Sequence, residues 1–305
     1  MSALDLVIIG GGPAGLTAGI YGSRAGLSTL ILEKSITGGQ MRLTGEIENF
    51  PGFPLISGAE FSTKLHEQAF NDGAAIKVAG VSGVDLSGGR ILVRTADETI
   101  EASSLIIATG TKNVNLDRPG AEEFVGRGVS FCALCDAGFM RGETVAVVGG
   151  GNSALEEADY LARFAEKVYL IHRRDEFRAV KAVQDKAASN PKIEMLLSSE
   201  VERIDGTDIV ETVTVKNKKT GESKKYPVAG VFMFVGKVPQ TEFLPPEIKT
   251  AKGGWIETNE RLETNVSGVF AAGDVRDTDL RQVITAAADG ARAAVNAYHY
   301  LQNPK

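Results

Sequence analysis

Two apolar runs that end in glycine mark the start of two similar segments of the chain. Leu4–Ile9 runs into Gly10, and Val145–Val148 runs into Gly149. Apolar runs of this length, bounded by turn residues, are typical of buried strands in parallel sheets. The pattern therefore predicts that each segment begins with such a strand.

Each predicted strand leads into a helix and then into a second strand. In the first segment, Pro13–Arg24 is the expected helix and Ser28–Leu32 the next strand. In the second segment, Ser153–Arg163 and Val168–Ile171 take the same places. Alternation of strands and helices predicts an α/β fold with parallel sheets.

Further segments extend both copies. Residues 76–107 alternate in short β-type pieces with glycine and aspartate turns, as a meander does. The other predicted elements are buried strands at Leu105–Gly110 and Gly268–Ala271, helices at Glu60–Phe70, Arg178–Ala188 and about Gln282–Tyr300, and a β-rich stretch over Ile193–Val235.

The final segment resembles the start of neither copy, so we expect it to complete the first domain. The fold class predicted is α/β, with two Rossmann-like three-layer nucleotide-binding domains, the second inserted in the first. The first domain would consist of residues 1–112 and 243–305, and the second of residues 113–242. Turn residues and prolines make Thr111–Leu116 and Thr241–Pro246 the candidate hinges.

Composition and charge exclude several classes of function. The chain has 305 residues, 43% of them hydrophobic and 24% charged, with a formal net charge of −6. It has no basic tract suited to nucleic acid or to an anionic membrane surface. Because the N-terminus lacks a cationic segment and its apolar run is too short for a signal peptide or membrane span, we expect a cytoplasmic protein.

The first glycine loop is predicted to bind the pyrophosphate of a dinucleotide. Its residues are Gly10, Gly12, Pro13, Ala14 and Gly15. Glycines there let backbone amides approach the phosphates at a helix N-terminus, where the dipole favours anions.

An acidic residue follows that loop at the customary distance. Glu33 lies about twenty residues further on, where a carboxylate accepts hydrogen bonds from both ribose hydroxyls of an adenosine. The alternative is a surface glutamate beside Lys34, and the strand–helix–strand context favours the nucleotide.

The second loop carries a different partner at the same offset. Gly149, Gly151, Asn152 and Ser153 repeat the loop, but the next strand ends in a basic segment with no acid at the matching position. That segment supplies His172, Arg173, Arg174 and Arg178. Guanidinium groups suit a 2′-phosphate, which a carboxylate would repel. The loop is thus predicted to bind NADPH, and the alternative of a solvated strand end explains one arginine better than three.

A glycine–aspartate pair ends the predicted strand near the C-terminus. Gly273 allows close approach of the backbone, and Asp274 can bind a ribityl or ribose hydroxyl. An aspartate in this position is otherwise a common turn or cap residue. Together with Glu33 and the strand that ends at Thr109 and Gly110, it predicts a site for FAD.

The only two cysteines form the motif Cys132-Ala-Leu-Cys135, followed by Asp136. In a reducing compartment such a pair is catalytic or metal-binding more often than structural. A thiolate at a helix N-terminus attacks disulfides, and Asp136 is placed to move the accompanying proton or to act as a first-turn acid.

Zinc is the alternative for this cysteine pair, but a structural site needs four ligands. His66, His172 and His299 show no ligand spacing, so no metal is predicted.

Taken together, the sequence resembles the low-molecular-weight, bacterial-type thioredoxin reductases from about Leu4 to Leu301. The motifs that carry the resemblance are GGGPAGL (10–16), GGQM (38–41), ENFPGF (48–53), IIATG (106–110), CALCD (132–136), GGGNSALEEA (149–158), HRRDEFRA (172–179), GVFAAGDV (268–275) and RQVITAA (281–287). The resemblance implies an FAD domain made of both chain ends, an inserted NADPH domain that carries the dithiol, and a homodimer.

The resemblance also implies individual roles. Cys135 would face the flavin and Cys132 would attack the disulfide of thioredoxin. The residues expected to line the FAD or its ring are Gly39, Gln40, Asn49, Arg281 and Gln282. The chain departs from the family where Leu134 replaces a common threonine, and where Lys237 and Gln240 replace a common histidine and asparagine.

The sequence therefore predicts an NADPH-dependent thioredoxin-disulfide reductase. Nicotinamide and dithiol would share one domain and reach one flavin in turn, which the family achieves by rotating the inserted domain. Alternatives are a flavin disulfide reductase for another dithiol protein, a dithiol oxidase that uses oxygen, and a flavin redox sensor without turnover. The complete arginine motif argues against the oxidase, which has no need of NADPH.

Overall fold

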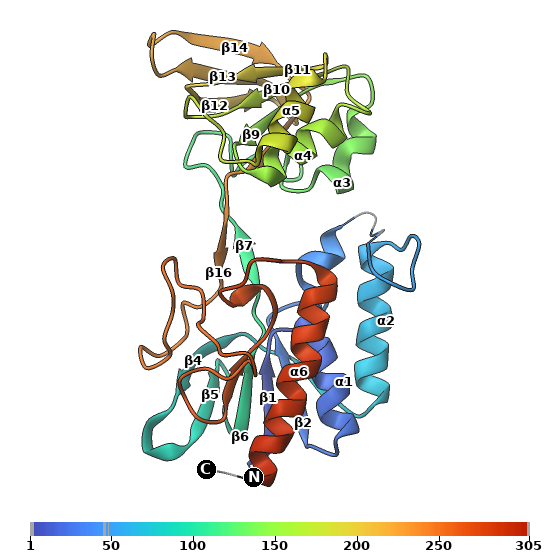
Figure 1. Cartoon of the computed structure of the whole chain (residues 1–305), viewed down its shortest axis with the longest axis vertical. Coiled ribbons are helices and arrows are strands. Elements are labelled where there is room, and N and C mark those ends of the chain that lie inside the picture. Colours follow the sequence, from blue (N-terminus) through green and yellow to red (C-terminus); the bar gives the residue numbers. More distant parts are fainter. Residues whose placement is uncertain (1–2, 45–46, 48, 304–305) are drawn as a thin grey trace. The chain divides into compact units, whose positions relative to one another are not determined.

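The computed structural model describes residues 3–44, 47 and 49–303, except for the side chains of Leu134 and Cys135. The chain divides into two compact units. Unit 1 consists of Met1–Lys112 and Val238–Lys305, and unit 2 consists of Asn113–Lys237. Each unit combines a largely parallel sheet with helices (Figure 1), as the alternating pattern predicts.

Unit 1 is built on one seven-stranded sheet. Its strands are β1 (Leu4–Ile9), β2 (Thr29–Glu33), β3 (Ala75–Val78), β4 (Val81–Asp85), β5 (Ile91–Thr95), β6 (Thr99–Ile107) and β17 (Val269–Ala271). Their order is β3-β2-β1-β6-β5-β4, and β17 also pairs with β6. Strands β4 and β5 run antiparallel to their neighbours, and the other pairs are parallel.

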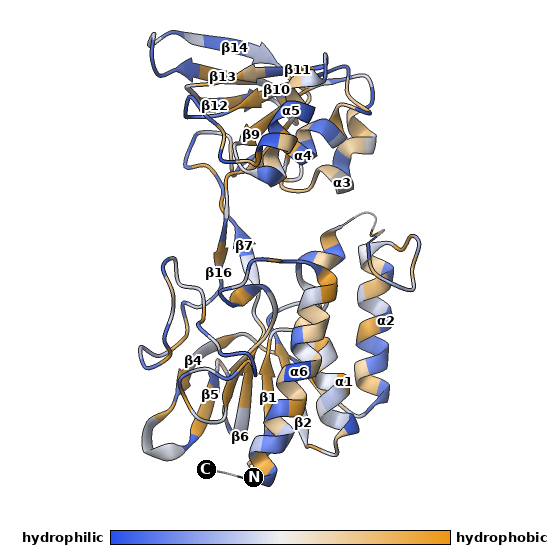
Figure 2. Cartoon of the chain, in the orientation of Figure 1, coloured by the Kyte–Doolittle hydropathy of each residue, from blue (hydrophilic) through white to orange (hydrophobic). Residues whose placement is uncertain are grey.

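Three helices pack on one face of this sheet: α1 (Pro13–Arg24), α2 (Gly58–Asn71) and α6 (Val283–Gln302) (Figure 1). Figure 2 shows the apolar residues gathered on the strands that they cover. Helices α1 and α6 approach so closely that a Cβ atom on Gly290 would lie 2.0 Å from the carbonyl oxygen of Ala14. The apolar contacts of the opposite face involve β4, β5 and loops of the C-terminal segment.

Two expectations for this unit need correction. Residues 76–107 do not form a single meander, because β3 joins the parallel part of the sheet beside β2. Helix α2 begins two residues before the predicted Glu60, since the Ser57 hydroxyl accepts a hydrogen bond from the Glu60 amide at 3.1 Å and caps the first turn. The bounds of β1 and α1 are as predicted.

Unit 2 contains a parallel sheet and an antiparallel sheet. The parallel order is β11-β10-β9-β15-β8, made of β8 (Val129–Ser130), β9 (Thr144–Gly149), β10 (Lys167–Ile171), β11 (Ile193–Leu196) and β15 (Gly230–Phe234). The antiparallel sheet comprises β12 (Ser199–Gly206), β13 (Val210–Asn217) and β14 (Ser223–Pro227). Thus the predicted β-rich stretch divides between both sheets.

The helices of unit 2 are α3 (Ala133–Asp136), α4 (Asn152–Leu161) and α5 (Lys181–Ser189). Their apolar residues form one core with one face of the parallel sheet, and the antiparallel sheet packs on the other face. Helix α5 begins three residues after the predicted Arg178, because the Arg178 amide donates to the carbonyl of Gly150 at 2.7 Å and Val180 is extended.

The chain crosses between the units at two adjacent segments. These are β7 (Thr111–Asn113) and β16 (Lys237–Pro239), which pair as a two-stranded sheet. The second crossing precedes Thr241–Pro246, the predicted hinge, which lies inside unit 1. There the Thr241 hydroxyl donates to the carbonyl of Gly254 at 3.2 Å.

Four short 3₁₀ helices complete the described elements: η1 (Gly39–Leu43), η2 (Ser87–Gly89), η3 (Ala137–Met140) and η4 (Gly273–Val275). Within residues 3–44, 47 and 49–303, no helix has the length and apolar character needed to cross a bilayer.

Candidate functional site

The first glycine loop joins β1 to α1 in unit 1 and leaves no room for a side chain at Gly10 or Gly15. A Cβ on Gly10, whose φ is +107°, would lie 2.4 Å from the carbonyl oxygen of Ala108, and one on Gly15 would lie 1.8 Å from that of Gly10. Pro13 opens α1, and Gly12 caps it without a side-chain hydrogen bond. The helix N-terminus therefore keeps amide groups available for an anion.

Glu33, at the end of β2, faces this loop. Its Oε2 accepts a hydrogen bond from the Gly11 amide at 2.7 Å, and its Oε1 accepts one from the Ser35 amide at 3.2 Å. A carboxylate has about four acceptor positions, so two remain for the hydroxyls of a ribose. The structure thus places Glu33 against the loop that the sequence pairs with it.

The glycine–aspartate turn after β17 lies against the same helix. Gly273 has a φ of +75°, and a Cβ there would lie 2.9 Å from the Cβ of Ala14. Its amide donates to Asp289 Oδ2 at 3.1 Å. Asp289 also forms a nearly buried ion pair with Arg276 at 2.8 Å. The pair fixes the turn that carries Asp274, and no sequence motif signalled it.

The other predicted residues of unit 1 contact one another in small groups. The Asn49 side-chain amide donates to Gln282 Oε1 at 3.1 Å. The backbone amide of Gln282 donates to the Thr285 hydroxyl at 3.1 Å. Gln40, on η1 after Gly39, donates to the Thr111 hydroxyl at 2.8 Å. These bonds attach the segment between β2 and α2 to β7 and to the residue before α6.

Arg281 sits immediately before α6 and stacks on the single tryptophan. Its guanidinium carbon lies 3.9 Å from the ring centroid of Trp255. The same group donates to the carbonyls of Asp274 and Arg276 at 3.5 and 3.3 Å. Arg281 is therefore half-buried and fixed beside the glycine–aspartate turn.

Thr109 and Gly110 are hydrogen-bonded to Gln240, one of the positions at which the chain departs from the family. The Thr109 hydroxyl donates to the carbonyl of Gln240 at 2.7 Å, and the Gln240 side-chain amide returns a bond to the Thr109 carbonyl at 2.7 Å. Gln240 also donates its backbone amide to Gly110, and its Oε1 accepts from Lys34 at 2.9 Å. Gln240 thus secures the end of β6 inside unit 1.

In unit 2 the second glycine loop joins β9 to α4. A Cβ on Gly149 would lie 2.5 Å from the carbonyl oxygen of Phe234, and one on Gly150 would lie 2.1 Å from the ring of His172. Gly151 caps α4 without a side-chain hydrogen bond. Next to it, Ser153 is exposed, and Asn152 Oδ1 accepts from the Val180 amide at 2.8 Å.

The His172 side chain is buried beneath the basic segment, whereas its three arginines are exposed. It is 6% exposed, stacks on Phe177 at 5.2 Å between centroids, and donates from Nε2 to the carbonyl of Glu176 at 3.0 Å. Burial, followed by the charges of the three neighbouring arginines, lowers the pKa of His172 below its ordinary value. The residue supports the loop as a neutral imidazole.

The three arginines are exposed together at the edge of the sheet. Arg173, Arg174 and Arg178 carry no side-chain hydrogen bond or ion pair to any residue in the described ranges. The charges of all three lower the pKa of His172, so all three lie near this residue. Exposed guanidinium groups without protein partners are suited to binding a phosphate.

The dithiol motif lies on a single helical turn of unit 2. Cys132 is half-buried and disulfide-bonded, and its amide donates to the Ser130 hydroxyl at 3.1 Å. The predicted Cys135 and the departure at Leu134 have side chains outside the described residues. Because α3 has only four residues, its dipole is smaller than the sequence-based argument for a lowered thiol pKa assumes. Asp136 is half-buried at its end.

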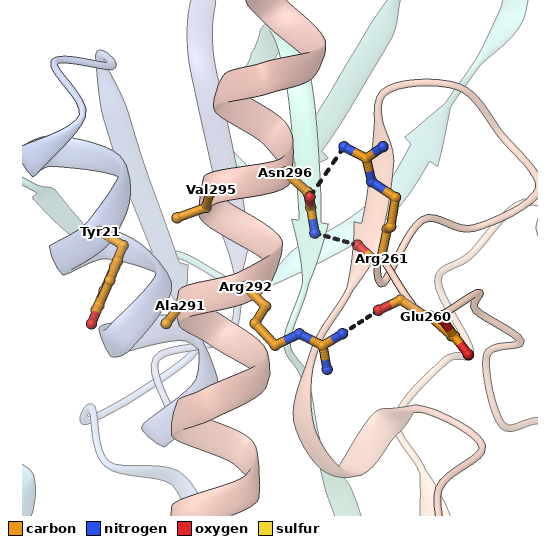
Figure 3. A pocket seen from close by; sticks show the side chains of 7 residues that line it. All are labelled: Tyr21, Glu260, Arg261, Ala291, Arg292, Val295 and Asn296. Atoms are coloured by element: carbon orange, nitrogen blue, oxygen red, sulfur yellow. Dashed lines mark hydrogen bonds between the residues drawn. The ribbon is translucent and has the colours of Figure 1, made fainter.

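A separate pocket of ≈ 390 Å³ lies on unit 1 between α1, α6 and a loop (Figure 3). Its residues are Tyr21, Glu260, Arg261, Ala291, Arg292, Val295 and Asn296. The Asn296 amide donates to the Arg261 carbonyl at 2.8 Å, and Arg292 donates to the Glu260 carbonyl. None of the residues predicted for catalysis or cofactor binding lines this pocket.

Comparison with known proteins agrees with this arrangement. Residues 4–290 match the pyridine nucleotide-disulphide oxidoreductase family. The chain is 43% identical to the thioredoxin reductase of Peptoclostridium acidaminophilum, over 98% of this chain and 97% of the relative. It is also 43% identical to the thioredoxin reductase of Bacillus subtilis (strain 168), over 98% and 95% of the two chains.

A solved structure extends the likeness to the fold. The thioredoxin reductase of Lactococcus lactis superposes with a TM-score of 0.83 at 42% identity, covering 98% of this chain and 99% of that one. The resemblance and the fold class inferred from sequence are thereby confirmed.

Proposed function

Because the chain belongs to the pyridine nucleotide-disulphide oxidoreductase family, we propose that it is an NADPH-dependent thioredoxin-disulfide reductase. The observation that carries this proposal is the disulfide-bonded Cys132 in the same unit as a glycine loop ringed by free arginines. A source of electrons and an exchangeable sulfur therefore belong to one unit. FAD, bound in unit 1, supplies the two-electron relay between them.

The residues of unit 1 fit FAD. Glycines whose Cβ atoms would collide with backbone form a cradle at Gly10, Gly15 and Gly273, beside a helix N-terminus without a side-chain cap. Glu33 has acceptor positions left for the ribose, and Asp274 is the matching residue for the ribityl chain. Gly39, Gln40, Asn49, Thr109, Gly110, Arg281 and Gln282 are assigned to the remaining contacts.

The residues of unit 2 fit NADPH. Gly149, Gly151, Asn152 and Ser153 hold the pyrophosphate at the start of α4. Arg173, Arg174 and Arg178 hold the 2′-phosphate, and His172 shapes their loop from behind. An enzyme that used NADH would have no need of three unpaired guanidinium groups at this position.

The two cysteines transfer electrons by thiol–disulfide exchange. In the reduced enzyme, the Cys132 thiolate attacks one sulfur of the partner disulfide, which forms a mixed disulfide and releases a partner thiolate. The Cys135 thiolate then attacks Cys132 Sγ, which restores the enzyme disulfide and releases the second partner thiolate. Asp136 provides a proton to a departing thiolate. Solvent supplies the second proton, so the partner gains two electrons and two protons in total.

The partner is a thioredoxin, by likeness to the relatives. An exposed aromatic residue lies close to the dithiol in sequence: Phe139, on η3, is 80% exposed. Because aromatic residues are enriched in protein interfaces, we infer that Phe139 contacts the partner. A redox-active cysteine pair of this kind belongs in a reducing compartment, so we place the enzyme in the cytoplasm.

Two copies of the chain form the working enzyme. The pocket of Figure 3 has exposed apolar side chains at its rim, Tyr21 at 46% and Val295 at 40%. Arg261, Arg292 and Glu260 give this face charges of both signs, which suits a contact between two identical surfaces. Light scattering tests this: a monomer at micromolar concentration would contradict it.

Stopped-flow absorbance of the flavin tests the catalytic proposal. In the wild type, NADPH should bleach the flavin and oxidised thioredoxin should restore its absorbance. Cys132→Ser should keep the bleaching and lose the recovery, whereas Ser82→Ala, an exposed hydroxyl on β4 of unit 1, should keep both. Bleaching without recovery in the wild type would point to a redox sensor, and recovery with a different dithiol protein alone would identify another partner.

A further inference from the structure

The segment 173–178 of unit 2, called the arginine loop below, contains a carboxylate that could neutralise the charge of its arginines. Asp175 follows Arg173 and Arg174 directly and precedes Arg178. Exposed carboxylates and guanidinium groups this near in sequence readily form bidentate pairs. Yet the three arginine side chains have no acidic partner among the described residues. Some other contact must hold the Asp175 carboxylate.

Two residues distant in sequence bind that carboxylate. The Ser198 hydroxyl donates to Asp175 Oδ1, and the Lys219 ammonium lies 2.8 Å from the same oxygen. Hydrogen bonding by Lys219, followed by that of Ser198, lowers the pKa of Asp175. Both contacts draw the carboxylate toward the turn after β11 and the β13–β14 hairpin.

Ser198 is itself held in an unusual backbone conformation. Its φ is +50°, which residues other than glycine rarely adopt, and it is 6% exposed. Its amide donates to the carbonyl of Arg174 at 3.0 Å, and its carbonyl accepts from the Lys218 amide at 2.6 Å. Ser198 therefore binds the arginine loop through both its backbone and its side chain.

We propose that Ser198 and Lys219 are positioning residues that hold Asp175 away from the arginines, and so set the preference of this site for a 2′-phosphorylated nucleotide. The inference rests on the proposed function, in which Arg173, Arg174 and Arg178 bind the 2′-phosphate. Loss of either contact weakens the hold on the carboxylate, which then pairs more often with a guanidinium and competes with the phosphate. The competition affects only ligands that carry this phosphate.

The test compares two ligands by calorimetry on the full-length holoenzyme. Adenosine 2′,5′-bisphosphate carries the 2′-phosphate, and ADP does not. Ser198→Gly removes the hydroxyl and suits the positive φ, so the fold is retained. We expect the bisphosphate to bind about tenfold more weakly, because one charge-assisted hydrogen bond to its 2′-phosphate is lost. The affinity for ADP should not change. Lys219→Ala should act in the same direction.

A second substitution distinguishes positioning from general damage. Adding Asp175→Ala to Ser198→Gly removes the competing carboxylate and should restore bisphosphate affinity. Unit 2 also offers a matched control, because the Ser223 hydroxyl donates to Glu202 at 2.6 Å and Lys216 lies 3.5 Å from the same carboxylate. Ser223→Ala, which removes a similar contact away from the loop, should change the affinity for neither ligand.

Three results would overturn the inference: unchanged bisphosphate affinity in Ser198→Gly, equal losses for both ligands, or no recovery in the double variant. A wild type that binds both ligands equally would instead overturn the assignment of the arginines to a 2′-phosphate. The wild-type comparison thus separates failure of the inference from failure of the proposed function.

Discussion

A single histidine supports both nucleotide loops of unit 2. The His172 ring lies against Gly150 of the phosphate loop and bonds to the carbonyl of Glu176 in the arginine loop. Burial and three guanidinium charges make the protonated ring unfavourable in this place. The residue therefore connects the folding of the site to pH.

His172 should make the stability of the enzyme depend on pH below neutrality. Its folded pKa lies below the ordinary 6.5, so the unfolded chain takes up the proton first as pH falls. The stabilisation is fully present above pH 6.5 and is lost as the pH falls through the folded pKa. Thermal melts between pH 8 and pH 5 should show a smaller loss of Tm for His172→Gln than for the wild type.

The control for this prediction is His299→Gln, which replaces an exposed histidine at the end of α6. Its melting profile should follow that of the wild type. Parallel profiles for His172→Gln and the wild type would show that proton uptake at His172 does not contribute to acid sensitivity.

At the scale of elements, a nearly buried ion pair attaches the glycine–aspartate turn after β17 to helix α6. Arg276 follows η4 and Asp289 lies on α6, with side chains 14% and 13% exposed. Asp289 also accepts the Gly273 amide, so one carboxylate holds both the turn and the cation. Removing it leaves the Gly273 amide without its acceptor and the Arg276 cation without its counter-charge in a poorly solvated place, although Arg276 keeps its hydrogen bond to Thr258.

Asp289→Ala should therefore destabilise unit 1 by roughly 3 kcal/mol and reduce its FAD content. Chemical denaturation and the flavin-to-protein absorbance ratio measure the two effects. Lys64→Ala removes an exposed pair with Glu60 on α2 and should cost less than about 0.5 kcal/mol. Similar losses in the two variants would contradict the role given to Asp289.

The same elements show what the sequence could predict. Strand β1 and helix α1 have the predicted bounds, because apolar run, glycines and Pro13 all act locally. The start of α5 depends on Arg178 bonding to Gly150, a contact that forms only after two strands pair. Asp289 and Ser198 lie outside any motif for the same reason: their partners are distant in sequence.

At the scale of the whole molecule, the repeated strand–helix–strand pattern revealed two nucleotide-binding units, which the fold of the Lactococcus lactis relative supports. The first crossing between the units lies within the predicted hinge Thr111–Leu116, whereas the second was harder to locate. Thr241–Pro246 carries turn residues, but these bind other parts of unit 1. The chain instead makes its second crossing at β16, which pairs with β7, and Gly236 beside β16 has a φ of +140°.

The proposed assignment of cofactors requires the units to change their relative orientation during turnover. NADPH and the dithiol both belong to unit 2, and each must approach the one flavin held by unit 1. The two cannot occupy the same place together, so we propose that unit 2 rotates about the paired crossings. A covalent tether that holds one orientation should leave one half-reaction intact and stop turnover.

Such tethers can be made by introducing two cysteines, one on each unit. Each variant carries one such pair and is screened for disulfide cross-linking between the units. Stopped-flow absorbance should then show either normal flavin reduction by NADPH with no transfer to thioredoxin, or normal flavin oxidation by the enzyme disulfide with no reduction by NADPH. Reducing the tether should restore steady-state turnover in the same sample, which excludes damage by the substitutions. Normal turnover in a fully tethered enzyme would contradict rotation, because both half-reactions would then be compatible with one arrangement.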